Sequence, residues 1–146
     1  MRLSLLSALA VSIAAALDAP NGNKELEYKD FAEDMLYWGY SWEPIKVKTD
    51  DGFILTTFRI KNRIGHSEER VPALNPVFIM NGLACDAEGW VGIGERDFKP
   101  WVLRLFDRGF DVYLGNNRGT KYAQEHESLT IEDPEYWHFS WAEMGS

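Results

Sequence analysis

The stretch from Pro76 to Trp90 constrains the fold of this chain more than any other segment. Four apolar residues in a row, Val77 to Met80, follow a proline and precede Asn81-Gly82. A short apolar run between turn residues is typical of a strand buried on both faces, as in a parallel sheet. The Asn-Gly-Leu sequence then forms a tight loop at the carboxyl end of this strand, where ligands bind in open α/β sheets. From these residues alone the loop is either an ordinary turn or part of a functional site.

Composition limits the size of the protein and its partners. The chain has 146 residues, of which 45% are hydrophobic and 26% charged, so it has room for one modest core and one domain. A net charge of -8 argues against nucleic acid or an anionic membrane surface as an electrostatic partner. The sequence has no Cys-x-x-Cys, His-Glu-x-x-His or acidic calcium loop, so it supports neither a metal nor a cofactor.

The amino terminus is typical of a secretory signal peptide, which we assign to residues 1–16. Arg2 is followed by an apolar run from Leu3 to Ala16 that ends in small residues. This run is shorter than the roughly 20 residues that span a bilayer, so a membrane anchor is the weaker alternative. Residues 17–29 are polar and predict a flexible lead-in, and 30–146 form the folded region. We therefore expect a secreted protein, or one delivered to the endomembrane or lysosomal lumen, with its single Cys85 lacking an internal partner.

A helix and a β-hairpin are predicted before the central strand. Asp30 is a candidate cap for a helix that ends at Gly39 and buries one face, made of Phe31, Met35 and Trp38. An alternating segment around Ile45 and Val47, the turn residues Asp50-Asp51-Gly52 and a β-rich run from Phe53 to Ile60 follow. These segments predict two antiparallel strands. Residues 61–75 are charged and predict a surface loop.

A βαβ unit is predicted after Trp90. Pro100 and Gly109 bracket a helix beginning at Trp101, and an alternating strand then runs from Phe110 to Gly115. The expected buried stripe of the helix is Phe98, Trp101, Val102, Leu105 and Phe106. A last helix is expected from Asp133, carrying Trp137, Phe139, Trp141 and Met144, and the sequence stops inside it. A hairpin plus one βαβ unit is the first half of something larger.

From about Tyr28 onward the chain resembles the N-terminal region of the acid lipase family of α/β-hydrolases, which includes gastric and lysosomal acid lipases and steryl ester hydrolases. The matching segments occur in the family's order: Gly39-Tyr40, Thr49 to Leu55, Asn81-Gly82-Leu83 with Trp90, Gly109 to Gly119, His126, and Tyr136 to Met144. The resemblance implies an α/β fold that is the N-terminal half of an α/β-hydrolase, truncated before the strand that carries the nucleophile.

The resemblance also implies an oxyanion loop. In this family a His-Gly-Leu turn places a backbone N–H in the oxyanion hole, and Leu83 matches the residue that donates it. Asn81 and Gly82 complete the loop, with Asn81 standing where the family has His. A preorganised N–H aimed at the developing negative charge stabilises an ester-cleaving transition state by about 3 kcal/mol. A backbone donor does not require the His side chain, so we expect its geometry to survive.

The rest of the catalytic machinery is not in this sequence. An α/β-hydrolase carries a Gly-x-Ser-x-Gly elbow, followed by Asp or Glu and then His, and no such elbow occurs here. Ser67 lies in a charged loop and is interpreted as a solvated serine. We expect structural roles for His126 and His138, and a loop-ordering role for Arg118, paired with a carboxylate or a carbonyl. The aromatic run from Tyr136 to Trp141 is interpreted as core packing, with a lipid-contacting patch as the alternative.

These observations predict the N-terminal portion of a secreted serine lipase or esterase acting in lipid metabolism. When complete, the enzyme would hydrolyse a triglyceride or steryl ester, whereas this chain alone is predicted to be inactive. The alternative is a non-catalytic secreted binding module derived from a lipase, and a fortuitous resemblance of an unrelated domain is the weakest interpretation. The partner of the complete enzyme is a lipid ester. Because the strand next to Val77–Met80 is not encoded, we also expect self-association through an open sheet edge.

Overall fold

The computed structural model describes residues 28–66, 70–92 and 98–145. The predicted signal peptide, most of the predicted lead-in and Ser67 lie outside these ranges. In chain order the elements are α3 (Lys29–Trp38), β1 (Tyr40–Lys48), β2 (Phe53–Arg63), β3 (Pro76–Met80), the 3₁₀ helix η1 (Ala87–Trp90), α4 (Trp101–Asp107), β4 (Asp111–Gly115), β5 (Glu125–His126), the 3₁₀ helix η2 (Pro134–Trp137) and α5 (Trp141–Met144).

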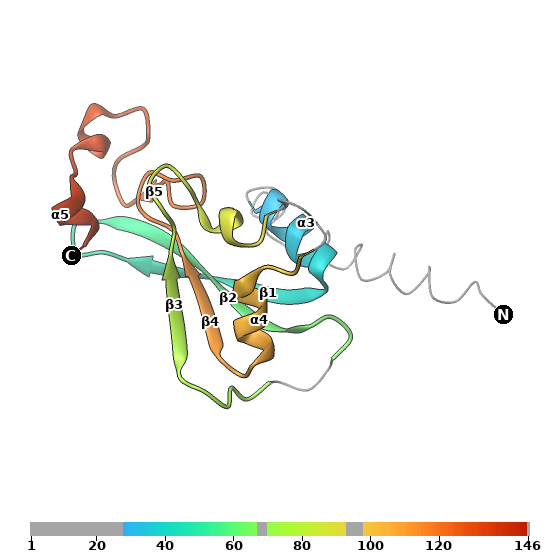
Figure 1. Ribbon diagram of the computed structural model, residues 1–146. Coiled ribbons are helices and arrows are strands. Elements are labelled where there is room, and N and C mark those ends of the chain that lie inside the picture. The colour runs from blue at the N-terminus through green and yellow to red at the C-terminus, as the bar shows by residue number, and fades with distance from the viewer. Residues whose placement is uncertain (1–27, 67–69, 93–97, 146) are drawn as a thin grey trace.

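One mixed sheet organises the described chain (Figure 1). Its strand order is β1-β2-β4-β3, and β5 pairs with β2. The pairs β1/β2 and β2/β4 are antiparallel, whereas β3 and β4 are parallel, with Ile79 opposite Leu114. The order β3, α4, β4 confirms the predicted βαβ unit. The architecture is the mixed α/β arrangement expected for a partial α/β-hydrolase region.

The predicted hairpin is confirmed. Its turn uses Gly52 at φ 93°, a left-handed conformation that side chains other than glycine rarely adopt. A Cβ at Gly52 would also lie 3.0 Å from Nε2 of His126, so both backbone and space require glycine here. β2 runs to Arg63, three residues beyond the predicted end at Ile60, because β1 begins at Tyr40 and pairs with it along its full length.

Helix α3 ends at Gly39 as predicted but begins earlier than predicted. Gly39 has φ 78°, and Phe31 and Met35 are fully buried. The N-cap position is occupied by Tyr28, so the prediction that Asp30 caps the helix is wrong. Asp30 lies in the first turn, where its carboxylate accepts a hydrogen bond from Lys121.

The last two residues of the predicted lead-in, Tyr28 and Lys29, contact or belong to the first described helix. Tyr28 is 5% exposed and its ring packs edge-on against Phe58, with centroids 5.3 Å apart. Lys29 already belongs to α3. The polar composition before Tyr28 hid an aromatic anchor, because burial of one ring leaves no periodic pattern.

Strand β3 is buried on one face, not on two as predicted. Ile79 is buried, whereas Phe78 is 60% exposed. Among the described residues β3 pairs only with β4, so it is an edge strand, and Phe78 lies on the sheet face that is exposed. A run of apolar residues therefore marked an edge strand here.

The predicted buried stripe of α4 is partly wrong. Val102 and Phe106 are buried as predicted, and Leu103 completes the buried face. Phe98 precedes the helix and is exposed, and Trp101 at its first position is 46% exposed. The prediction extended the helical period through Pro100, where the helix has not begun.

The predicted single helix after Asp133 is also wrong. The chain forms η2 and then α5, which starts afresh at Ser140 with a capping box in which the side chains of Ser140 and Glu143 bond each other's backbone. Tyr136 is fully buried, but Trp141 is 68% exposed. The aromatic run is therefore divided between core and surface.

The core lies between α3, α4 and the sheet. The ring of Phe31 stacks on that of Phe58 from β2, with centroids 4.1 Å apart, and Trp42 and Tyr122 pack edge-on against the same Phe58. Val102 and Phe106 of α4 belong to the same buried cluster. This core fixes β2, β4 and β3, and the carboxyl ends of the parallel strands β3 and β4 carry the candidate site.

Candidate functional site

Two asparagines mark the carboxyl ends of the two parallel strands. Asn81 follows β3 directly and Asn116 follows β4 directly. Because β3 and β4 are neighbours and run in the same direction, these residues lie at the same end of the sheet. Open α/β sheets bind their ligands at this end, where the carboxyl ends of the strands lie.

The Asn81 side chain is buried and ties two loops together. Its Nδ2 donates hydrogen bonds to the carbonyl oxygens of Gly82, at 2.9 Å, and Cys85, at 2.6 Å. Its Oδ1 accepts a hydrogen bond from the backbone N–H of Asn117, at 2.8 Å. One amide thus holds the loop after β3 and joins it to the loop after β4.

Leu83 lies at the outer side of this loop with its backbone free. Its side chain is 74% exposed, and none of the described residues accepts a hydrogen bond from its N–H. The turn closes beneath it through a hydrogen bond from the N–H of Cys85 to the carbonyl of Gly82, at 3.2 Å. A Cβ added to Gly82 would meet no described atom within 4 Å. The N–H of Leu83 thus has no acceptor among the described residues, and the space at the neighbouring Gly82 is open.

Asn116, at the end of the neighbouring strand β4, also joins two segments of the chain by hydrogen bonds. Its Oδ1 accepts the N–H of Ala87 at 2.8 Å, and its Nδ2 donates to the carbonyl of Thr56 at 2.8 Å. Asn116 is 1% exposed, so both bonds are shielded from water. It fixes the start of η1 to β2, and the loop containing Leu83 is held at both of its ends.

The predicted loop-ordering role of Arg118 is confirmed. The guanidinium is buried, bonds the carboxylate of Asp51 in the hairpin turn, and lies 4.3 Å from the ring centroid of Phe53. The pKa of Asp51 lies below its ordinary value because Arg118 donates a hydrogen bond to its carboxylate. The loop after β4 is therefore attached to the hairpin.

His126 has the structural role expected for it. Its Nδ1 accepts the N–H groups of Ser128 and Leu129, each at 3.1 Å, so Nε2 carries the proton and donates to the carbonyl of Asp51 at 3.0 Å. Both ring nitrogens are thus engaged with the backbone. His138 is exposed and follows η2.

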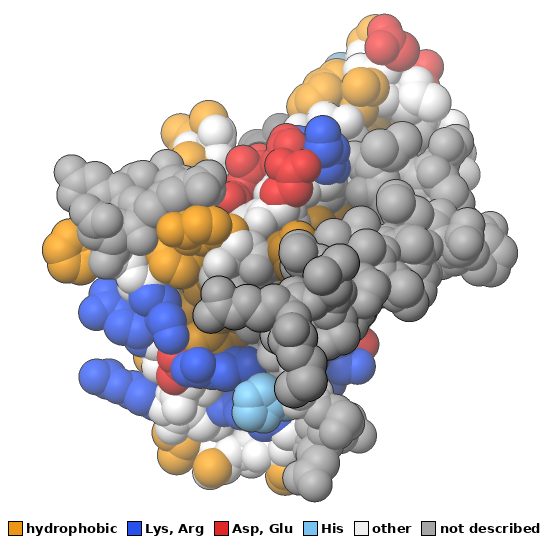
Figure 2. Space-filling model, turned by 90° about the vertical axis from the view of Figure 1, so that its right-hand side faces the viewer, with side chains coloured by type: hydrophobic (Ala, Val, Ile, Leu, Met, Phe, Trp, Pro, Cys, Tyr) orange, Lys and Arg blue, Asp and Glu red, His pale blue; other side chains and the backbone are white. Residues whose placement is uncertain are grey.

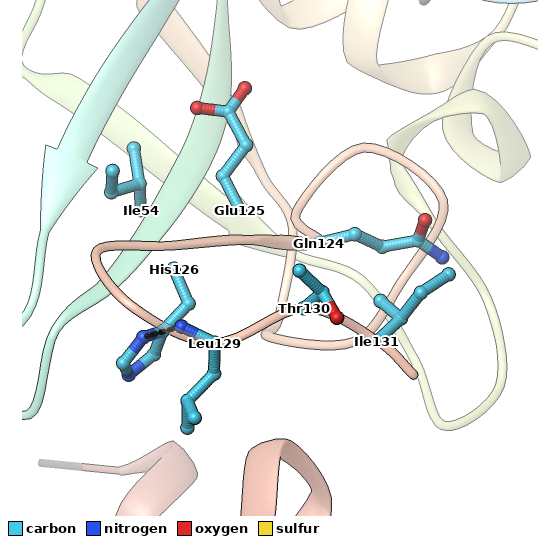
Figure 3. Close-up of a pocket in the computed structure, with 7 residues that line it drawn as sticks. All are labelled: Ile54, Gln124, Glu125, His126, Leu129, Thr130 and Ile131. Atoms are coloured by element: carbon cyan, nitrogen blue, oxygen red, sulfur yellow. Dashed lines mark hydrogen bonds between the residues drawn. The ribbon is translucent and has the colours of Figure 1, made fainter. Parts of the chain in front are cut away.

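A shallow, open pocket of about 380 Å³ lies beside His126 (Figure 3). Its lining residues are Ile54, Gln124, Glu125, His126, Leu129, Thr130 and Ile131. Figure 3 shows the loop after β5 curling so that the His126 ring turns toward the backbone of Leu129. Neither Asn81 nor Leu83 lines this pocket, so it is separate from the candidate oxyanion loop.

A second polar cluster links α3, η1 and the loop after β4. Glu88 accepts a hydrogen bond from the hydroxyl of Tyr122 at 2.8 Å and pairs with Lys121 at 3.0 Å. Burial, together with the hydrogen bond to Glu88, raises the pKa of Tyr122. Lys121 also bonds Asp30. We assign these residues to holding the fold, since each charge has an opposite partner.

The surface view shows where charge gathers on one face (Figure 2). Lys and Arg side chains group on one part of this face and acidic side chains on another. Several basic residues of the described chain are paired, including Arg63 and Lys99, which both bond Asp107, at 2.7 and 2.8 Å. The absence of a nucleic-acid partner stays a prediction.

In the ranges that the structure covers, no three His, Cys, Asp or Glu side chains gather as they would around a metal ion. No helix within these same ranges has the length and apolar character that crossing a membrane requires.

Chemically, what this arrangement offers is a backbone N–H donor at Leu83 without an acceptor among the described residues. Such an N–H can donate to a carbonyl oxygen that gains negative charge. Attack on the carbonyl carbon needs a nucleophile and a base as well, and the sequence contains no Gly-x-Ser-x-Gly elbow to supply them.

Comparison with known proteins defines the class. Residues 31–94 match the model of the partial alpha/beta-hydrolase lipase region. This segment contains α3, the hairpin, β3 and the loop with Leu83. Most of α3, the hairpin, β3 and the loop after it are thus similar to a partial alpha/beta-hydrolase lipase region.

Individual relatives narrow the class to the acid lipases. The chain is 41% identical over 111 residues to gastric triacylglycerol lipase from Bos taurus, covering 74% of this chain and 26% of that protein. It is 36% identical over 114 residues to lysosomal acid lipase/cholesteryl ester hydrolase from Homo sapiens, with 77% and 28% covered. It is 37% identical over 115 residues to lipase member K from Mus musculus, with 79% and 28% covered. The chain is thus homologous to part of the gastric and lysosomal acid lipases and spans about a quarter of their length.

Proposed function

We propose that this chain supplies the N-terminal part of a serine lipase or esterase that hydrolyses triglycerides or steryl esters. The observation that carries the proposal is the free N–H of Leu83, held at the carboxyl end of β3 in an Asn-Gly-Leu loop. The names of the relatives, a triacylglycerol lipase and a cholesteryl ester hydrolase, support a lipid ester as the substrate.

In the complete enzyme the Leu83 N–H would donate to the carbonyl oxygen of the scissile ester. As a serine attacks, this oxygen becomes an oxyanion, and the donor stabilises it most at that point. A second donor follows the nucleophile in such enzymes, and the serine, acid and histidine come later in the chain order. Asn81 and Gly82 shape the loop, and the Asn81 side chain takes no part in the proton transfers.

By this proposal the chain on its own hydrolyses no ester at an enzymatic rate. It has an oxyanion donor without a positioned nucleophile or base. The alternative is a secreted binding module descended from a lipase, which retains the loop without its chemistry.

The genomic DNA beyond the codon for Ser146 tests the proposal directly. An in-frame Gly-x-Ser-x-Gly within roughly a few tens of residues, followed by codons for the acid and the histidine, is the expected result. A stop codon confirmed in the transcript, with no downstream elbow, would favour the binding module.

We further propose that the protein enters the secretory pathway and resides outside the cell or in the lysosomal lumen. The apolar run that ends at Ala16 and the gastric and lysosomal relatives support this location. N-terminal sequencing of protein from the medium or from a lysosomal fraction should begin near Leu17. Recovery from the cytosol with Met1 retained would contradict the assignment.

Self-association of the isolated chain is part of the same proposal. β3 presents an outer edge that no described strand covers, and Phe78 on it is exposed. An open apolar edge is a template for strand pairing with another chain. In the complete enzyme the strand carrying the nucleophile would cover it.

A further inference from the structure

The side chain of Asn81 is placed to set the position of the Leu83 N–H. The loop from Gly82 to Cys85 leaves β3 and returns toward η1, and Leu83 lies on its outer side. Ala84 within it has φ 55°, a left-handed conformation that alanine seldom adopts. Such a backbone persists only where surrounding contacts hold it.

Asn81 supplies those contacts from below. Its amide faces two carbonyl oxygens, those of Gly82 and Cys85, and one N–H, that of Asn117. Only one orientation of the amide satisfies all three groups, with Nδ2 toward the carbonyls and Oδ1 toward the N–H. The Gly82 carbonyl belongs to the peptide unit that carries the Leu83 N–H, and the Cys85 carbonyl lies at the far end of the loop, so the amide holds that peptide unit and the end of the loop.

The bond to Asn117 fixes the loop relative to the rest of the sheet. Asn117 follows β4, and its neighbour Arg118 is attached to the hairpin through Asp51. The loop after β3 is therefore held against an element that belongs to the core. A donor fixed in this way loses little freedom when it meets an oxyanion, which is how a preorganised donor stabilises charge.

We propose that Asn81 is a positioning residue, whose buried amide clamps the Gly82–Cys85 loop so that the Leu83 N–H points outward at a fixed place. The hydrogen bonds that make up the clamp all lie within this chain. Its catalytic consequence rests on the proposed function of Leu83.

Two substitutions separate the clamp from simple packing. Asn81→Ala removes all three hydrogen bonds. Asn81→Asp has nearly the same shape and keeps an acceptor for the Asn117 N–H, but it loses both donors and places a carboxylate against two carbonyl oxygens. Asn75→Ala, at an exposed asparagine just before β3, is the matched control.

Hydrogen exchange of the 146-residue chain, followed by mass spectrometry, measures how strongly the clamp protects the backbone amides of the two loops. At neutral pH, Asn81→Ala should lower protection about tenfold in peptides covering both 82–87 and 116–120. Asn81→Asp should lower it in 82–87 and leave 116–120 protected. Protection of β2 should stay as in the control, which shows that the variants are folded.

The pH profile of Asn81→Asp excludes a role in shape alone. The introduced carboxyl faces carbonyl oxygens, which favour its protonated form and raise its pKa above the ordinary value of about 3.9. Below that pKa it regains one O–H donor, so protection of 82–87 should recover on acidification. Two charged groups lie nearby in the chain. The carboxylate of Asp86 accepts a hydrogen bond from the Glu88 N–H, and the guanidinium of Arg118 bonds the carboxylate of Asp51. In either variant, protection of peptide 82–87 equal to that of the control at neutral pH would overturn the inference.

The full-length enzyme that the proposed function requires gives the second readout. There Asn81→Asp should lower kcat about tenfold or more at neutral pH with KM little changed, and kcat should recover as pH falls. If protection of the loop is lost but kcat equals that of Asn75→Ala, the clamp stands and the oxyanion role of Leu83 fails. If protection is unchanged, the clamp fails whatever the activity.

Discussion

Arg118 and Asp51 show how single residues attach the site to the fold. The guanidinium is buried while the side chain of Asp51 is 46% exposed, so the two ends of this ion pair differ in their contact with water. Removing Asp51 leaves a buried cation without its carboxylate, and the ring of Phe53 beneath it satisfies only its face. The cost of losing the pair therefore arises mainly at Arg118.

We expect Asp51→Ala to lower the free energy of unfolding by about 1–2 kcal/mol at pH 7, after discounting for the exposed carboxylate. The pKa of Asp51 is lowered in the folded state by the hydrogen bond from Arg118. Its stabilising contribution is thus present above the unfolded pKa of about 3.9 and is lost as pH falls through the folded value.

Urea unfolding at pH 7 and at successively lower pH measures this effect. The difference between wild type and Asp51→Ala should shrink below about pH 4. Asp50→Ala, at the exposed neighbouring aspartate, is the control and should change stability by less than about 0.5 kcal/mol. Equal effects of the two substitutions, or a difference independent of pH, would contradict the assignment.

At the scale of elements, the contact between Phe31 and Phe58 holds α3 to the sheet. Phe31 is fully buried and stacks on Phe58, whereas Leu36 on the same helix is 52% exposed. Phe31→Ala should destabilise the chain by about 3–5 kcal/mol, because it removes a buried ring and leaves a cavity. Leu36→Ala should cost under about 1 kcal/mol, since much of this side chain contacts water. Chemical denaturation monitored by tryptophan fluorescence compares them, and similar midpoints would show that α3 is not docked as described.

Strand β3 carries the element-scale prediction about association. Phe78→Lys places a charge on the open edge, which opposes pairing with another strand. Sedimentation velocity should find oligomers in wild type and a shift toward monomer in this variant. Val71→Lys, at an 85% exposed loop residue, should leave the wild-type distribution unchanged. A sharp wild-type monomer with strong exchange protection of residues 77–80 would contradict association through β3.

Sequence reasoning located elements where a periodic pattern met a strong stop signal. Gly39 ended α3 and Gly52 turned the hairpin, because each needs a positive φ that glycine supplies. It failed where burial depends on what lies opposite, as at Phe78 on an edge strand and at Trp101 on the first turn of α4. No local pattern reports which faces of an element find a neighbour.

The candidate site divides in the same way. Resemblance to a family motif indicated Leu83, but the roles of Asn81 and Asn116 did not follow from it. Asn116 joins Ala87 to Thr56, residues 29 and 60 positions away in the chain. Such contacts depend on the pairing of β4 with β2 on one side and β3 on the other, so the motif indicated the residues without their partners. The unusual Asn81 was visible in the sequence, and the clamp explains what its amide does.

At the scale of the whole molecule, the chain carries the loop that we propose as an oxyanion loop at the carboxyl ends of β3 and β4, and its sequence contains no nucleophile elbow. A donor alone does not cleave an ester. Even when the whole triad of a protease is removed, the residual acceleration over water is only about a thousand- to ten-thousand-fold, with the binding pocket intact.

The most direct measurement is labelling of the purified 146-residue chain with a serine-directed phosphonate, beside assays on a short-chain chromogenic ester and an emulsified triglyceride. Our account predicts no stoichiometric label by mass spectrometry and no turnover that the phosphonate blocks. Labelling of one serine with activity lost in proportion would contradict it, and Ser67, in the Gly65-His66-Ser67 sequence, would then be the first residue to replace by alanine.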